Sequence, residues 1–178
     1  MDDATLIKEC VKGNVKAHRF LFEKFAPKML TVCMRYAKNK SDAEDVLQDA
    51  FIKVFNKLSE FKNEGSLEGW IRRIMVNTSL DQIRKNNKFS NDMDLDTVSY
   101  KLEYLDFKFN NLETEDLLKM INNMPNGYKI VFNMFAIEGY SHQEIATTLG
   151  VSENTSKSQY LRARSFLKNE LEKIHFER

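Results

Sequence analysis

Apolar side chains return every three or four residues through most of this chain, and that spacing constrains the fold more than any other feature. Leu6 and Cys10 begin the pattern, and Val46, Ala50 and Val54 continue it. This is the period of an α-helix with one buried face, whereas strands repeat every second residue. The 178 residues include only six Gly and two Pro, as expected of long helices joined by few turns. The sequence therefore predicts an all-α protein.

Polar and helix-breaking residues divide this pattern into segments. Pro27 interrupts an apolar face, so we expect a bend or a helix break there. Ser41 and Glu44 match a capping box and predict that a helix starts at Ser41. The polar stretch 56–65 predicts a loop over most of its length. After it, a helix should run from about residue 66 to residue 86.

The periodicity also predicts two helical domains. Between about residues 89 and 112 the helical spacing fades and acidic side chains gather. We therefore expect a first domain over 3–88, a linker over 89–112 and a second domain over 113–176. The linker is unusually apolar for a free connection, which leaves open whether it packs on a domain.

Composition and the order of residues exclude several classes of function. Cys10 and Cys33 stand alone and the three histidines are scattered, so we expect no metal, no cofactor and no catalytic set. Both cysteines should be buried as small apolar residues. No apolar run approaches the roughly 18 residues of a membrane span, and the first residues lack the pattern of a signal peptide. These features predict a cytoplasmic, non-enzymatic protein with no small-molecule substrate.

The segment that starts at Ser141 carries the most specific functional signal. Ser141 and Glu144 form a second capping box, Gly150 permits a positive φ in a tight turn, and Ser152 can cap the next helix. This pattern predicts a helix-turn-helix, whose second helix lies in the major groove of DNA. The alternative is a simple αα-hairpin with a solvated face. The outward residues expected to contact DNA are Glu153, Asn154, Thr155, Lys157, Ser158, Gln159, Arg162 and Arg164. Ser156 departs from the motif, which more often has a β-branched aliphatic residue at that position.

This segment resembles region 4 of bacterial sigma factors, which reads the −35 promoter element. The stretches 42–55 and 67–84, with Phe61 between them, resemble region 2 of the same proteins. Both regions, in this order and in so short a chain, resemble the extracytoplasmic-function (ECF, group 4) sigma factors of the sigma-70 family. These proteins retain only regions 2 and 4. The resemblance covers most of the chain apart from the linker.

The resemblance implies that the helix after residue 42 binds the clamp helices of the polymerase β′ subunit. An acidic stripe with aromatic edges suits a charged interface with an apolar centre. The residues implicated are Asp45, Gln48, Asp49, Phe51 and Phe55. Phe51 and Phe55 fit a place in the hydrophobic core equally well.

The resemblance also implies that the loop at 56–66 and the helix after it open the −10 promoter element. Capture of an unstacked base requires a polar pocket, a stacking surface and nearby cations. The residues that offer these are Lys57, Phe61, Lys62, Asn63, Arg72, Arg73 and Asn77. Trp70 could act as a strand-separating wedge, but the core is the favoured place for it.

The function implied is that of a sigma factor, which directs bacterial RNA polymerase to specific promoters and initiates DNA-templated transcription. The partners implied are promoter DNA, the polymerase core through the β′ clamp helices and the β flap, and an anti-sigma factor. Two alternatives remain at this stage. A stand-alone helix-turn-helix regulator would bind operator DNA as a dimer. An interaction module would bind polymerase or an anti-sigma factor but not DNA.

Overall fold

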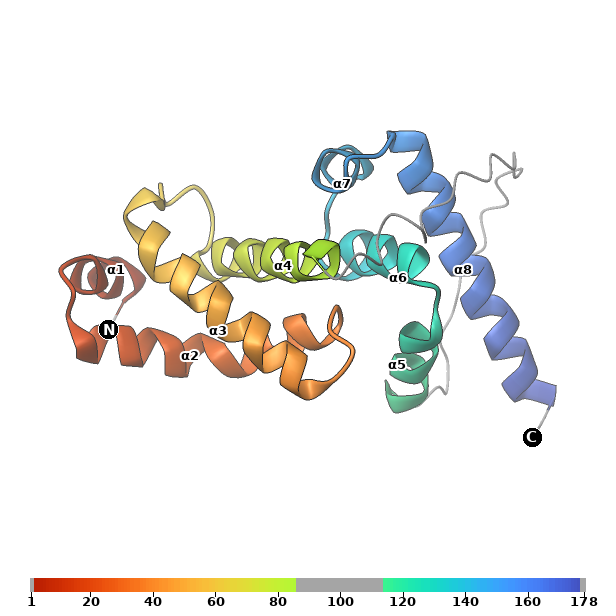
Figure 1. Ribbon diagram of the computed structural model, residues 1–178, viewed down its shortest axis with the longest axis horizontal. Helices are drawn as coiled ribbons and strands as arrows, with labels where there is room; N and C mark the ends of the chain where they lie inside the picture. Colours follow the sequence, from red (N-terminus) through yellow and green to blue (C-terminus); the bar gives the residue numbers. More distant parts are fainter. Residues whose placement is uncertain (1, 86–113, 177–178) are drawn as a thin grey trace. The chain divides into compact units, whose positions relative to one another are not determined.

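The computed structural model describes residues 2–85 and 114–176, with side chains described for 2–85 and 119–173 (Figure 1). The predicted linker, 89–112, lies outside the described residues. The chain divides into two compact units, Met1–Asn87 and Lys88–Arg178, called here the N-terminal and C-terminal units. Every regular element in the described part of the chain is helical, which confirms the all-α class.

The N-terminal unit is a packed group of helices. Its elements are α1 (Asp3–Val11), α2 (Val15–Met34), α3 (Lys40–Lys57), the short 3-10 helix η1 (Leu58–Glu60) and α4 (Leu67–Lys85). Helix α3 packs against both α2 and α4, and it runs diagonally across α2 in Figure 1. Leu21, Val54 and Met75 are fully buried where these three helices meet. Burial of each such side chain contributes about 1.5–3 kcal/mol to folding.

Of the two outcomes predicted at Pro27, a bend or a helix break, the break is wrong. The helix runs without interruption from Val15 to Met34 with Pro27 inside it. Pro27 itself is exposed, while Phe25 and Met29 on either side of it are buried. Apolar burial on both sides therefore outweighs the one backbone hydrogen bond that proline cannot make.

The predicted helix start at Ser41 is also wrong. Helix α3 begins at Lys40, and the residue before it, Asn39, is the N-cap. The Asn39 side-chain oxygen accepts a hydrogen bond from the backbone N–H of Asp42 at 2.8 Å. Asparagine caps as well as serine does, so the earlier residue takes the role and Ser41 lies in the first turn.

The C-terminal unit is built on one long helix. Its elements are α5 (Thr114–Asn123), α6 (Asn126–Phe132), the π-helical segment η2 (Asn133–Ile137), α7 (His142–Leu149) and α8 (Glu153–Phe176). Helix α8 packs against α5, α6 and α7, as Figure 1 shows. Met120, Ile121 and Met124 form a core cluster with Ala163 and Leu167 of α8. Across the two described stretches, no helix is long and apolar enough to cross a membrane.

Candidate nucleic-acid and protein interfaces

The helix-turn-helix forms as the sequence predicted. Ser141 is the N-cap of α7 and accepts a hydrogen bond from the Glu144 backbone N–H at 3.2 Å, and the Glu144 carboxylate accepts one from the Ser141 N–H at 2.9 Å. Gly150 ends α7 in the left-handed region, at φ 71°. Ser152 then accepts a hydrogen bond from the backbone N–H of Thr155 at 3.0 Å. Both predicted serine caps and the glycine turn are therefore confirmed.

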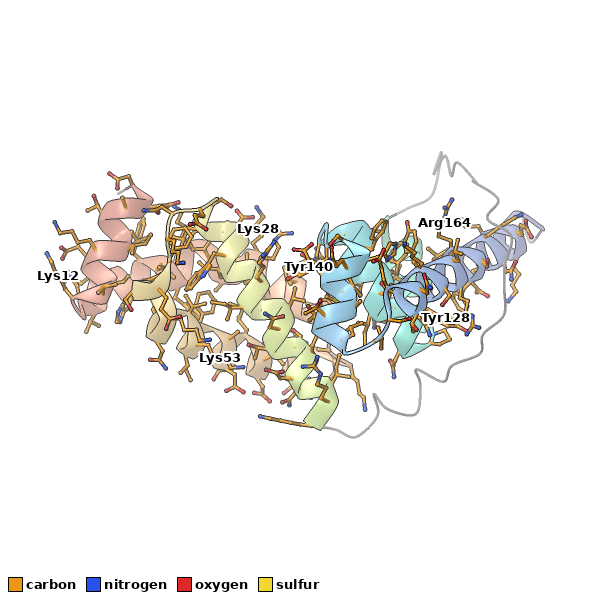
Figure 2. All side chains as sticks on the ribbon, turned by 90° about the horizontal axis from the view of Figure 1, so that it is seen from above. Lys12, Lys28, Lys53, Tyr128, Tyr140 and Arg164 are labelled. Carbon is orange, nitrogen blue, oxygen red and sulfur yellow. The ribbon has the colours of Figure 1, made fainter. Side chains whose placement is uncertain are left out.

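The first turns of α8 present polar side chains to solvent. Glu153, Asn154 and Lys157 are exposed. The side chains that are half-buried are Thr155, Ser158, Arg162 and Arg164. Figure 2 marks Arg164 on α8. A helix whose first turns carry exposed polar and basic side chains can reach base edges and phosphates in a major groove.

Gln159 does not belong to this outward face, so its predicted outward position is wrong. The side chain is only 3 % exposed. Ser156, Ala163 and Leu167 are also buried, and their spacing places Gln159 on the same inward face of α8. The polarity of the side chain suggested that it faces solvent, but its position along the helix places it on the buried face.

An ion pair links two of the exposed residues of α8. The Lys157 ammonium lies 2.7 Å from the Glu153 carboxylate, one helical turn earlier. The hydrogen bond from Lys157 lowers the pKa of Glu153, which keeps that carboxylate charged. In the free protein the Lys157 ammonium is therefore already paired with a carboxylate.

Sequence reasoning missed a polar contact between the two helices of the motif. His142, the first residue of α7, shares a hydrogen bond with Ser156 of α8, and Nδ1 lies 2.9 Å from Oγ. The imidazole ring also stacks on Phe135 of η2, with ring centroids 4.2 Å apart and planes 11° from parallel. The unusual serine at position 156 was the only signal in the sequence for this contact.

In the N-terminal unit, the predicted loop is shorter than expected. Helix α3 continues to Lys57 and η1 follows, so only residues 61–66 lie outside helices. Asn63 adopts a positive φ of 58°, and Ser66 accepts a hydrogen bond from the Gly69 backbone N–H at 3.1 Å. The loop therefore turns sharply and ends in a cap for α4. Lys62 and Asn63 are exposed along it, and Lys57 is exposed at the end of α3.

Phe61 joins this loop to α4. Its ring lies 5.5 Å from the ring of Trp70, in a tilted arrangement. Both residues are half-buried, so Trp70 meets only in part the expectation that it belongs to the core. Arg73 and Asn77 are exposed three and seven residues after Trp70, so they share its side of α4. Aromatic surface, a cation and an amide therefore meet on one face.

Arg72 has a different setting from Arg73. It is half-buried and donates a hydrogen bond to Glu68 at 3.2 Å. Lys28 of α2 lies 2.7 Å from the same carboxylate and is marked in Figure 2. The hydrogen bond from Lys28 lowers the pKa of Glu68. This group ties α2 to α4 beside the exposed face of α4.

The polar face predicted on α3 is present but has a different apolar centre. Asp45, Gln48 and Asp49 are exposed, and their spacing places them on one side of the helix with Ile52. Ile52 is 59 % exposed and was missed by the sequence reasoning. A protein interface combines an apolar centre with a polar rim, and Ile52 with its polar neighbours offers both. We call Asp45, Gln48, Asp49 and Ile52 the α3 face.

The two phenylalanines predicted on this surface lie differently. Phe51 is 2 % exposed, so its assignment to the surface is wrong and its place is in the core. Its ring packs 4.7 Å from the ring of Phe22 on α2. Phe55 is half-buried, and its ring lies 4.6 Å from that of His18. Phe55 therefore borders the α3 face, whereas Phe51 lies beneath it.

The fold and these surfaces define a two-unit, all-α protein with a DNA-binding helix-turn-helix. Comparison with known families gives two matches, to sigma-70 region 2 over residues 21–89 and to sigma-70 region 4 over residues 114–167. Together they cover well over half of the chain. The chain belongs to the sigma-70 family, within its ECF group. It is a sigma factor, which directs RNA polymerase to promoters and initiates transcription.

Individual relatives agree with this assignment. The ECF RNA polymerase sigma-E factor of Haemophilus influenzae is 24 % identical and matches over 98 % of this chain and 97 % of its own. The sigma-E factor of Escherichia coli K12 is also 24 % identical, over 98 % of this chain and 96 % of its own. The sigma factor RpoE of Bartonella quintana, solved with the anti-sigma factor NepR, shares the fold. Its TM-score is 0.57 at 23 % identity, over 89 % of this chain and 98 % of that one.

Proposed function

We propose that this sigma factor works through three separate surfaces of its own. The start of α8 reads the −35 duplex, the loop and exposed face of α4 capture the −10 element, and the α3 face binds the polymerase core. The observation that carries the proposal is the capped helix-turn-helix, which presents Glu153, Asn154 and Lys157 to solvent. All three surfaces lie on regular helices or on the loop between them, so each is held in a defined shape.

For the −35 element, the proposed contacts to base edges come from the first two turns of α8. Asn154 and Lys157 offer the groups that read adenine and guanine in the major groove. Arg162 and Arg164 follow one to two turns later and serve as phosphate contacts, which hold the helix in register. Gln159 takes no part because it is buried. The β flap of the polymerase is proposed as the protein partner of this unit.

For the −10 element, the proposed binding surface combines the loop with the face of α4 beneath it. Phe61 and Trp70 provide stacking surface for an unpaired base. Arg73 and Asn77 supply a cation and an amide beside it. Lys62 and Asn63 line the loop, and Lys57 ends the helix before it. Opening of the duplex needs no covalent step, because contacts to the unpaired strand offset the cost of unstacking. We therefore propose that the chain acts without enzymatic chemistry of its own.

For the polymerase, the proposed contact is the α3 face with Phe55 at its border. Asp45 and Asp49 complement a basic partner, and Ile52 gives the interface an apolar centre. The partner proposed is the clamp helices of the β′ subunit. Since the Bartonella quintana relative was solved with an anti-sigma factor, we also propose an anti-sigma factor as a regulator of this chain. Action on polymerase and chromosomal DNA places the protein in the cytoplasm under this proposal.

The test is transcription in vitro with purified core polymerase and genomic DNA. The chain should restore specific starts, and the double variant Asn154→Ala, Lys157→Ala should lose them while still binding core. The matched control is Lys173→Ala, because Lys173 also pairs with a glutamate on α8, Glu170 at 2.6 Å. An interaction module would show no starts at all. A stand-alone regulator would bind DNA as a dimer without core.

The polymerase contact has its own matched pair of variants. Ile52→Glu should abolish binding to core, because it places a charge at the apolar centre of the α3 face. Val11→Glu makes the same change at a site of similar exposure, 53 % against 59 %, outside that face. Binding measured by gel filtration or light scattering should be lost for the first and kept for the second. Equal behaviour of the two variants would contradict the proposed surface.

A further inference from the structure

The angle between α7 and α8 decides where the first turn of α8 lies in a groove. One end of this helix pair is fixed by the turn, where Gly150 is left-handed and the Val151 backbone N–H donates to the Ala146 carbonyl at 3.0 Å. A single hinge leaves the angle between two helices open. A second contact away from the hinge is needed to fix it.

The His142–Ser156 hydrogen bond is such a second contact. His142 begins α7 and Gly150 ends it, so the two contacts stand a full helix apart, about 12 Å for eight residues. Ser156 is fully buried and lies two residues after Asn154 and directly before Lys157, both of which belong to the proposed reading surface. Any rotation of α8 that moves those two side chains also stretches the bond to His142.

The imidazole is itself held in place. It stacks flat on Phe135, and the Tyr160 ring of α8 lies 5.9 Å from it and 4.6 Å from Phe135. These rings come from η2, α7 and α8, so they join three elements at one point. An aliphatic residue at position 156 would pack here without directional preference, whereas a hydrogen bond weakens steeply when it is misaligned.

We propose that His142 is a positioning residue for promoter recognition, which sets the orientation of α8 through its hydrogen bond to Ser156. The proposal rests on the proposed function of α8 as the reading helix. His142 touches no base in this account. It acts only through the helix that does.

The charged groups that face His142 indicate how acid should affect this junction. On α8 they are Lys157, which disfavours the imidazolium, and Glu153, which favours it less strongly. Phe135 and Tyr160 also pack against the imidazole, and neither side chain carries a negative charge that would stabilise the imidazolium. Partial burial is the largest cause that lowers the pKa of His142, and Lys157 adds to it. Acidification therefore places an unfavourable charge at the junction of α7 and α8.

The experiment measures selectivity with the full chain assembled on core polymerase. The probes are a duplex selected by the wild-type holoenzyme from a randomised pool and a scrambled duplex of the same composition. The readout is selectivity at pH 7.5, measured as the dissociation constant for the scrambled duplex divided by that for the selected duplex. His142→Phe keeps a flat ring on Phe135, and Ser156→Ala removes only the hydroxyl. Each should lower the ratio about fivefold, the equivalent of one ordinary hydrogen bond.

A double variant and a matched control complete the set. His142→Phe with Ser156→Ala should be no worse than either alone, because both remove the same bond. Thr147→Ala is the control, since its hydroxyl donates to the Gln143 carbonyl at 3.0 Å within α7 and links no second helix. It should leave the ratio unchanged. Additive effects of the two single variants would overturn the proposal.

The pH profile separates positioning from a merely structural role. The wild-type ratio should fall between pH 7.5 and pH 5, whereas the ratio for His142→Phe should stay flat. His142→Asn restores a polar group near the Nδ1 position without a titratable ring, so it should regain selectivity and also stay flat. Thermal unfolding of each variant confirms that the comparison is made between folded chains. A pH dependence retained by His142→Phe would overturn the proposal.

The reading function of α8 and the positioning role of His142 can fail separately. If the wild-type holoenzyme selects no duplex, the proposed function of α8 fails and the positioning role falls with it. If the wild type is selective and both single variants keep its ratio, the reading function stands and only the role of His142 is wrong.

Discussion

The two units differ in what they bury where their helices meet. In the N-terminal unit, α2, α3 and α4 meet through apolar side chains, and the Cys33 sulfur lies 4.0 Å from that of Met75. The polar residues buried there are Thr78 and Ser79. Ser79 donates to the Met75 carbonyl of its own helix at 2.9 Å, and Thr78 accepts a hydrogen bond from the partly exposed Lys53 of α3 at 3.2 Å, so the polar contacts between these helices lie at their edges, as the Lys28–Glu68 pair also does. In the C-terminal unit, α8 buries Ser156 and Gln159 against its neighbours, and η2 buries Asn133.

This difference indicates that the two units are selected for different properties, overall stability in one and helix orientation in the other. Apolar contacts are non-directional, so they give stability and tolerate small shifts. Hydrogen bonds between helices are directional, and a buried polar group without a partner costs free energy. The N-terminal unit therefore serves as a stable support for its surfaces. The C-terminal unit gives up some stability for a defined orientation of one helix.

The largest expected effect tests the apolar side of this comparison. Met75→Ala should lower the free energy of unfolding of the N-terminal unit by about 2–5 kcal/mol, because it opens a cavity at a fully buried position. Trp70, the only tryptophan of the sequence, reports on this unit in urea titrations. Met34→Ala is the control at a site 48 % exposed and should change little. An equal loss for both would contradict the apolar core described here.

The next effect has the opposite sign and lies in the C-terminal unit. Gln159→Met should raise the stability of that unit by about 1 kcal/mol, because the buried Gln159 Oε1 accepts no hydrogen bond and methionine has a similar shape. Hydrogen exchange of the α8 amides would measure it. Gln143→Met, on the exposed side of α7, serves as the control. A loss of stability would mean that the glutamine amide has a structural role.

A smaller effect follows from His142 and concerns pH. Its pKa in the folded chain lies below that of the unfolded chain, which is about 6.5. The unfolded chain then binds more protons, so this contribution to stability is fully present above about pH 6.5 and is lost as the pH falls through the lower folded value. The thermal midpoint of the C-terminal unit should drop in mild acid, by less than the gain from Gln159→Met. His142→Phe should remove that dependence.

The smallest effect concerns the ion pair at the start of α8. Glu153→Gln should raise the affinity for a scrambled duplex about twofold at low salt, because it releases Lys157 for phosphates and removes a negative charge near them. Fluorescence anisotropy over a salt series would measure it. The control is Glu170→Gln, which disrupts the similar pair with Lys173 far along the same helix. Equal gains for both would indicate an effect of net charge alone.

Features set by neighbours along the chain could be predicted from the sequence. Ser141, Gly150 and Ser152 act on backbone groups within four residues of themselves, so their spacing was enough to predict the motif. The start of α3 shows the limit of such reasoning, since two capping residues competed and Asn39 prevailed over Ser41. Local signals predict that a helix begins, but not always which residue begins it.

Features set by distant parts of the chain could not be predicted in this way. Whether Phe51 faced solvent or core depended on Phe22 of another helix, and the sequence left that choice open. Gln159 was assigned by its polarity, although its register on α8 decided its burial. Ile52 was overlooked because an apolar residue at helical spacing normally packs inward. In each case tertiary packing determined the outcome.

The buried thiol of Cys33 has a practical consequence. Burial raises its pKa to about 11, so at neutral pH the sulfur is protonated as well as shielded. Thiolates, not thiols, react with alkylating reagents, and a reagent must also reach the sulfur. Chemical modification of Cys33 should therefore occur only during the intervals when helices α2 and α4 separate. Its rate in native buffer therefore measures how often the helices of the N-terminal unit separate.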